Sequence, residues 1–176
     1  VQSWGNTGSG DDEFSTYGPS EIVIDSQDNL YLLDNGVKKF SNSGQFIAKY
    51  NYSGSSLNID RDDNLYLTGA TEYFYNGTPL AIQKVSSSGN LLASFFSMND
   101  VPGHEDAQIG KVAVAPSGNI YVSEVYSDLV RRYSPSGNFL GSFTTSNGNT
   151  SEMIIADDNR LYTISKGNIY QYDLLG

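Results

Sequence analysis

A short polar turn carries three oxygen-bearing side chains at a spacing that could hold calcium. Asp60, Asp62 and Asn64 stand at the first, third and fifth positions of a calcium-loop pattern. The glutamate that such a loop places at its twelfth position is missing, because Thr71 stands there. Aspartate and asparagine also favour tight turns by hydrogen-bonding to their own backbone. We therefore expect a structural turn, keep calcium as the alternative, and predict no other cofactor.

The single histidine, His104, lies in the longest insertion of the chain. Asp100, Glu105 and Asp106 are its neighbours in sequence, so a metal ligand or a general base is one interpretation. An exposed loop histidine is the other. One histidine cannot build a zinc site of several histidines, and no Gly-x-Ser-x-Gly motif marks a nucleophilic serine. The sequence therefore predicts no catalytic residue and favours a protein that is not an enzyme.

A second insertion, over residues 69–80, carries a cluster of aromatic side chains. Tyr73, Phe74 and Tyr75 are adjacent and precede a polar turn. Exposed aromatic residues mark sites for ligands or partners, because they bring a large contact area at low entropic cost. The alternative is that the rings fold back onto the body of the protein. We take these three residues with His104 as the candidate binding surface.

Four copies of one pattern must position these insertions. Each copy is an apolar segment, a tight polar turn and a second apolar segment with a tyrosine. The equivalent tyrosines recur at a spacing near 40 residues, which is typical of β-propeller blades. We expect them to lie in equivalent, buried sites between blades, and they are Tyr31, Tyr66, Tyr121 and Tyr162.

The repeats predict a single all-β domain over residues 1–176, a propeller-like fold of four blades. Each blade is expected to hold up to four antiparallel strands, over residues 20–50, 55–95, 110–143 and 151–173. The fourth repeat is one strand short. The segment from Val1 to Gly5 matches the outer strands of the other blades, so we expect it to complete the last blade beside residues 168–173. The strand could come from the same chain or from another chain.

Charge and composition narrow the classes of partner. The formal net charge is −10, which argues against nucleic acid and anionic membranes as partners. The chain has no cysteine, so disulfides and thiolate sites are excluded. No apolar run is long enough for a transmembrane helix. Asn-x-Ser/Thr sequons at Asn51, Asn76 and Asn149 support an extracellular or cell-surface location.

Several segments resemble NHL repeats. They are the stretch from Trp4 to Asp25, the stretch from Ser117 to Val122 and the stretch from Ser136 to Leu140. The resemblance covers almost the whole chain, about four repeats. It implies a β-propeller, commonly six-bladed, that binds proteins, glycans or RNA on one rim. This chain has four repeats and lacks the basic surface of the RNA-binding members, so we expect a protein or glycan partner.

Together these features favour a non-catalytic binding or assembly scaffold that works through its inter-blade loops. The first alternative is a propeller-type hydrolase or lyase with a central cation. The second alternative is a structural subunit that forms a homo-oligomer by completing a propeller ring. The three readings differ in what they place at the ring axis and at the two ends of the repeat array.

Overall fold

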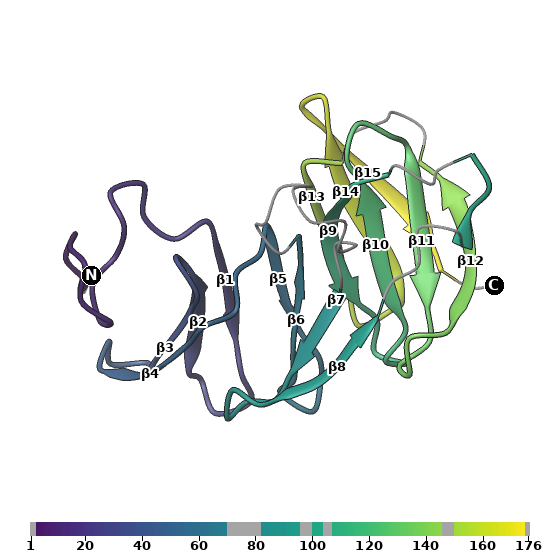
Figure 1. The fold of residues 1–176 in the computed structure, drawn as a ribbon. Helices are drawn as coiled ribbons and strands as arrows, with labels where there is room; N and C mark the ends of the chain where they lie inside the picture. The colour runs from purple at the N-terminus through teal and green to yellow at the C-terminus, as the bar shows by residue number, and fades with distance from the viewer. Residues whose placement is uncertain (1–2, 70–81, 96–99, 104–106, 146–149, 175–176) are drawn as a thin grey trace.

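The computed structural model describes residues 3–69, 82–95, 100–103, 107–145 and 150–174. Within them the protein is an all-β propeller of four blades, each an antiparallel sheet (Figure 1). This confirms the predicted fold class. No helix of the described residues is long and apolar enough to cross a membrane.

Blades 1 and 2 are four-stranded meanders, in which the order of strands in the sheet follows the chain. Blade 1 holds β1 (Glu21–Ile24), β2 (Leu30–Leu33), β3 (Val37–Phe40) and β4 (Phe46–Tyr50). Blade 2 holds β5 (Ser56–Ile59), β6 (Leu65–Thr68), β7 (Ile82–Val85) and β8 (Leu91–Phe95).

Blade 3 repeats this plan, whereas the sheet of blade 4 has three strands. Blade 3 holds β9 (Ile109–Val114), β10 (Ile120–Glu124), β11 (Leu129–Tyr133) and β12 (Phe139–Thr144). Blade 4 holds β13 (Glu152–Ile155), β14 (Arg160–Ser165) and β15 (Asn168–Asp173).

The hairpin between β2 and β3 shows how local sequence sets these sheets. Asn35 and Gly36 have φ angles of 48° and 115°. Positive φ at both central residues is what a type I′ turn requires, and its twist matches that of the flanking strands. The Asn35-Gly36 sequence therefore accounts for the geometry of this hairpin.

The repeat alignment is confirmed by strand register. In every blade the repeated tyrosine of the second strand pairs with the residue two positions after the shared polar position of the first strand. The four pairs are Val23–Tyr31, Asn58–Tyr66, Ala113–Tyr121 and Ile154–Tyr162.

Apolar layers between successive blades form the core. Blades 1 and 2 enclose Tyr31 and Leu57, blades 2 and 3 enclose Tyr66, and blades 3 and 4 enclose Tyr121. Burial of this apolar area is the main force that holds one blade on the next. The prediction that the repeated tyrosines are buried between blades is confirmed for these three. Tyr162 is half-buried, because no blade among the described residues packs on its face of blade 4.

The blades follow one another as an arc that starts at blade 1, beside the N-terminal segment (Figure 1). The innermost strands lie side by side in chain order, β1 against β5, β5 against β9, and β9 against β13. Among the described residues no further blade packs on the outer face of blade 1 or of blade 4. The N-terminal segment covers part of the outer face of blade 1, where Trp4 and Phe14 contact Phe40.

Within the described residues the expected outer strand over residues 1–5 does not complete blade 4, so completion of that blade by a strand from another chain stays a prediction. Residues 3–6 form no strand, and β15 pairs only with β14 among the described residues. The Trp4 ring instead stacks on Phe40 of blade 1, with ring centroids 5.1 Å apart. The physical reason is the arc: blade 4 lies at its far end, so the segment packs on the nearest apolar surface.

Candidate functional site

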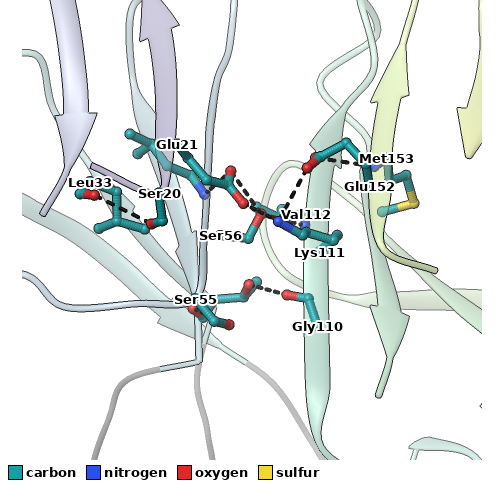
Figure 2. Close-up of polar contacts among 12 residues, drawn as sticks. Ser20, Glu21, Leu33, Ser55, Ser56, Gly110, Lys111, Val112, Glu152 and Met153 are labelled. Carbon is teal, nitrogen blue, oxygen red and sulfur yellow. Dashed lines mark hydrogen bonds and ion pairs between the residues drawn. The ribbon is translucent and has the colours of Figure 1, made fainter. Parts of the chain in front are cut away.

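Polar side chains from the innermost strands meet where these strands begin (Figure 2). Glu21, Ser56, Lys111 and Glu152 occupy the same position of the repeat in β1, β5, β9 and β13. The Lys111 ammonium forms ion pairs with Glu21 and with Glu152, the latter at 3.2 Å. The Glu21 carboxylate also accepts hydrogen bonds from the Leu57 amide at 3.0 Å and from the Ser56 hydroxyl.

This cluster is internally neutralised. Burial by itself would lower the pKa of Lys111, but the carboxylates of Glu21 and Glu152 outweigh it and raise the pKa. The Lys111 ammonium thus neutralises the two carboxylates, Glu21 and Glu152, that a central metal ion would need as free ligands. No group of three or more His, Cys, Asp or Glu side chains is arranged to hold a metal ion in the described part of the chain.

A second polar arrangement lies on the face of blade 1 that packs on blade 2. The Asp25 carboxylate accepts a hydrogen bond from the Tyr31 hydroxyl at 3.3 Å and pairs with the Lys39 ammonium at 3.2 Å. The same ammonium lies 4.7 Å from the centroid of the Tyr31 ring, within cation–π range. Three different interactions therefore tie these side chains into one acid–tyrosine–cation triad.

Blade 2 carries the same triad at equivalent positions. Asp60 accepts from the Tyr66 hydroxyl at 3.2 Å and pairs with Lys84 at 3.3 Å. The Lys84 ammonium lies 5.1 Å from the centroid of the Tyr66 ring. The triad is therefore a repeated feature of the blades, built by an aspartate after the first strand, a tyrosine on the second and a cation on the third.

The triads shift the ionisation of their members. Burial would raise the pKa of Asp25, but hydrogen bonds from Asn29 and Gln27 and from Lys39 outweigh it and lower the pKa to about 2. Burial and the Asp25 charge together raise the pKa of the Tyr31 hydroxyl. Both effects favour a carboxylate anion beside a neutral tyrosine at all ordinary pH values.

Asp60, Asp62 and Asn64, the predicted calcium candidates, lie in the β5–β6 turn. The Asp60 carboxylate accepts from the backbone amides of Asp62 and Asn64 at 3.0 and 2.8 Å. This is the turn chemistry that the sequence favoured. Lys84 already supplies the positive charge at Asp60, so calcium at this turn stays an untested prediction.

The aromatic insertion and the histidine lie outside the described residues. Tyr73, Phe74, Tyr75 and His104 are therefore not placed, and their role as a binding surface remains a prediction. Asp100, one of the carboxylates near the histidine, is described and accepts a hydrogen bond from the Tyr133 hydroxyl at 3.1 Å. That carboxylate is engaged with blade 3.

A cleft of about 670 Å³ opens between blades 3 and 4. It lies between β12 and β15, beside the outer edge of the three-stranded blade. Aromatic rings and one cation are prominent among its lining, which includes Tyr121, Arg132, Leu140, Phe143, Tyr172 and Asp173. Sequence reasoning did not find this cleft, because its walls come from two repeats and none of them departs from the blade pattern.

The two ends of the arc expose residues that are buried elsewhere. Ile22 of blade 1 is 55% exposed, whereas its equivalents Leu57, Val112 and Met153 are 1–2% exposed. Burial of these equivalents comes from the preceding blade. The end face of blade 1, carrying Ile22 and Ile24, therefore has the chemistry of a blade contact and no blade on it.

Blade 4 shows the same contrast on its opposite face. Ile164 is 40% exposed, and its equivalent Leu33 in blade 1 is 4% exposed. Ile169 is 73% exposed, and its equivalent Val37 is fully buried. The end face of blade 4, which carries Ile154, Tyr162, Ile164 and Ile169, is also an uncovered blade contact.

The N-terminal segment partly imitates a preceding blade. In three places an aromatic ring from an outer-strand position packs on a turn glycine of the next blade. Each ring is so close that a Cβ on the glycine would collide with it, in the pairs Trp4–Gly44, Tyr50–Gly89 and Phe95–Gly137. Trp4 is thus a packing residue.

Comparison with solved structures supports the propeller fold. A gluconolactonase from Xanthomonas campestris superposes with a TM-score of 0.62 at 13% identity, over 91% of this chain and 60% of its own. A virginiamycin B lyase from Staphylococcus aureus gives 0.56 at 11% identity, over 88% and 55%. The WD40 propeller domain of Doa1 gives 0.62 at 15% identity, over 90% and 51%.

These similarities establish a likeness of fold. The chain spans between half and three fifths of the length of the solved structures it resembles. No protein-family model and no curated protein sequence matches it. The activities of the neighbours are thus properties of those proteins, and they are found on propellers longer than this chain.

Proposed function

We propose that this chain is a non-catalytic scaffold for assembly and binding, of NHL type, whose two end faces dock on a second copy of the same chain. The observation that carries the proposal is the contrast in exposure between equivalent residues. Ile22 and Ile164 are exposed, and their equivalents inside the arc are buried. Contiguous exposed apolar surface on a folded protein marks a contact with a partner.

A second copy fits these faces because the two ends complement each other. Every contact within the arc joins the face with the repeated tyrosine on one blade to the first-strand apolar residue of the next. Blade 4 offers Tyr162 on its end face, and blade 1 offers Ile22 on the other. Blade 1 of one copy on blade 4 of another therefore repeats a contact that already occurs three times. Two copies joined head to tail at both ends would form a ring of eight blades.

Association in solution tests this assembly. We expect a dimer by analytical ultracentrifugation at micromolar concentration. Ile22→Lys and Ile164→Lys should each give a monomer, because each places a charge in the docked face. Leu92→Lys is the matched control, since Leu92 is 53% exposed on β8 and away from both end faces.

Mixing the two monomeric variants distinguishes head-to-tail docking from contact between like faces. Each variant keeps one intact face, so a mixture should regain a single head-to-tail contact and show mixed dimers. A wild-type chain that stays monomeric, or an Ile22→Lys variant that still dimerises, would contradict the proposal.

The scaffold is also proposed to bind a protein or glycan partner through the loop face with Tyr73, Phe74, Tyr75 and His104, outside the cell or at its surface. The acidic charge favours a neutral or cationic partner. A Tyr73/Phe74/Tyr75→Ala variant should keep its unfolding midpoint and lose the partner in pull-downs. Retention of the same partner would place the site elsewhere.

An enzymatic alternative is favoured by one observation, the likeness of fold to a gluconolactonase and a virginiamycin B lyase. The Glu21–Lys111–Glu152 cluster weighs against it, because the axial carboxylates are held by an internal cation. A bound metal at one equivalent by elemental analysis, together with lactone hydrolysis lost in His104→Ala, would favour the enzyme over the scaffold.

A further inference from the structure

Blade 3 keeps the cation of the repeated triad and lacks its acid. Arg132 pairs across the strands with Tyr121, as Lys39 does with Tyr31. The position of Asp25 is taken by Ala115, which forms the same backbone turn, with its amide donating to the Asn119 carbonyl. Blade 3 therefore carries a tyrosine and a guanidinium at two of the triad positions and no carboxylate at the third.

Blade 4 offers a comparison, because it lacks both charged members of the triad. There the acid is replaced by Ala156, and the residue opposite Tyr162 is Gln171, which carries no charge. Both charges have been removed together, which leaves nothing to be neutralised. In blade 3 only the acid has been removed, and a positive charge remains in a partly buried place.

The two remaining groups of blade 3 have no polar partner in the described residues. Neither the Arg132 guanidinium nor the Tyr121 hydroxyl has a hydrogen bond or an ion pair there. Both residues line the 670 Å³ cleft between blades 3 and 4. Arg132 is half-buried, so its charge is only partly hydrated. A half-buried cation gains from an anionic partner more than a fully exposed one does.

We propose that the cleft binds a small ligand with one carboxylate and an apolar or ring-shaped body. The ligand carboxylate takes the place of the missing aspartate and accepts hydrogen bonds from Arg132 and Tyr121. A guanidinium can donate two parallel hydrogen bonds to one carboxylate, which fixes the orientation of the ligand. The ligand body lies against Phe143, Tyr172 and Leu140, which form the apolar part of the cleft.

Charge around the cleft limits the ligand to a single negative charge. Asp173 also lines the cleft, and it pairs with Arg160 at 3.5 Å. The protein carries a net charge of −10, so a dianion would meet repulsion at long range.

Titration of the 176-residue chain with benzoate, followed by calorimetry and NMR, tests the site. Benzamide is the neutral probe of the same shape. We expect saturable binding of benzoate, with benzamide binding about tenfold more weakly or worse because it lacks the charge. Benzoate and benzamide that bind equally, or an absence of saturable benzoate binding, would overturn the proposal.

Two variants then locate the contact. Ala115→Asp supplies the missing carboxylate internally, so it should form an ion pair with Arg132 and weaken benzoate binding about tenfold. Arg132→Met should weaken it as much. Lys166→Met, which removes an exposed cation from the β14–β15 turn, should leave it unchanged.

The Ala115→Asp variant also has a readout that does not depend on a ligand. Its carboxyl pKa, measured by NMR, should lie below the ordinary value, as that of Asp25 does, and should rise when Arg132→Met is added. An Ala115→Asp variant with an ordinary pKa and wild-type benzoate affinity would overturn the assignment. If Ala115→Asp does not fold, the comparison of Arg132→Met with Lys166→Met decides.

Discussion

Replacing the repeated tyrosine by alanine in two different blades measures how much a neighbouring blade contributes to the free energy of unfolding. Tyr66 is fully buried between blades 2 and 3, and its hydroxyl donates to Asp60 at 3.2 Å. Removing a large buried aromatic ring costs about 3–5 kcal/mol, and the lost hydrogen bond adds about 1 kcal/mol. We therefore expect Tyr66→Ala to lower the free energy of unfolding by roughly 4–6 kcal/mol.

Tyr162→Ala makes the same change on a face that no blade covers. Tyr162 is half-buried, and it occupies the same register opposite Ile154 as Tyr66 does opposite Asn58. Removal of a partly exposed ring leaves no closed cavity, so the expected loss is about 1 kcal/mol. The difference between the two variants is the part of the energy that comes from the neighbouring blade.

Urea unfolding followed by circular dichroism measures both variants, in an Ile22→Lys background that prevents docking of a second copy. Tyr66→Phe is the control, because it keeps the ring and loses only the hydroxyl, at a cost of about 1 kcal/mol. Equal losses for Tyr66→Ala and Tyr162→Ala would refute the reasoning, since the two residues would then have equal surroundings.

Buried charges and the N-terminal segment lead to three more expectations. Because the pKa of Asp25 is lowered to about 2, its carboxylate contributes roughly 2 kcal/mol of stability above pH 4. This contribution is lost as the pH falls through about 2. The urea midpoints of wild type and Asp25→Asn should therefore converge over that pH range. Glu124→Gln removes a carboxylate that pairs with the buried Arg131 at 2.7 Å and should cost about 3–5 kcal/mol. Asp157→Asn, at the exposed Arg61 pair, should cost nothing measurable by the same assay. Deletion of residues 1–5 should lower the unfolding midpoint because Phe40 loses the Trp4 ring; an unchanged midpoint would show that this stacking is not stabilising.

Local features of the sequence were enough to predict the blades. Strand pairing within a blade joins segments a few residues apart, so alternation of apolar residues and turn residues such as Asn35-Gly36 specify it directly. The shared position of Tyr31, Tyr66 and Tyr121 predicted burial between blades for the same reason: equivalent residues on equivalent strands meet equivalent neighbours. The Asp60 turn was also accessible, since its hydrogen bonds stay within five residues.

Relations between distant repeats could be seen only in the tertiary structure. The pairing of Lys111 with Glu21 and Glu152 joins residues from three blades, and it depends on how the first strands converge (Figure 2). The place of Trp4 on blade 1 depended on the arc, because pairing with β15 would have needed the two ends to meet.

The sequence by itself determined the secondary structure, the repeat and the residue types on each blade face, because those depend on neighbours along the chain. Tertiary structure decided which faces stay open and which charges find partners. Ala115 was visible in the sequence as a departure from aspartate, but its meaning required Arg132 and Tyr121 to be seen together on one cleft. Which side chains meet across two sheets is set by the packing of whole blades, and the spacing of residues within one repeat does not specify it.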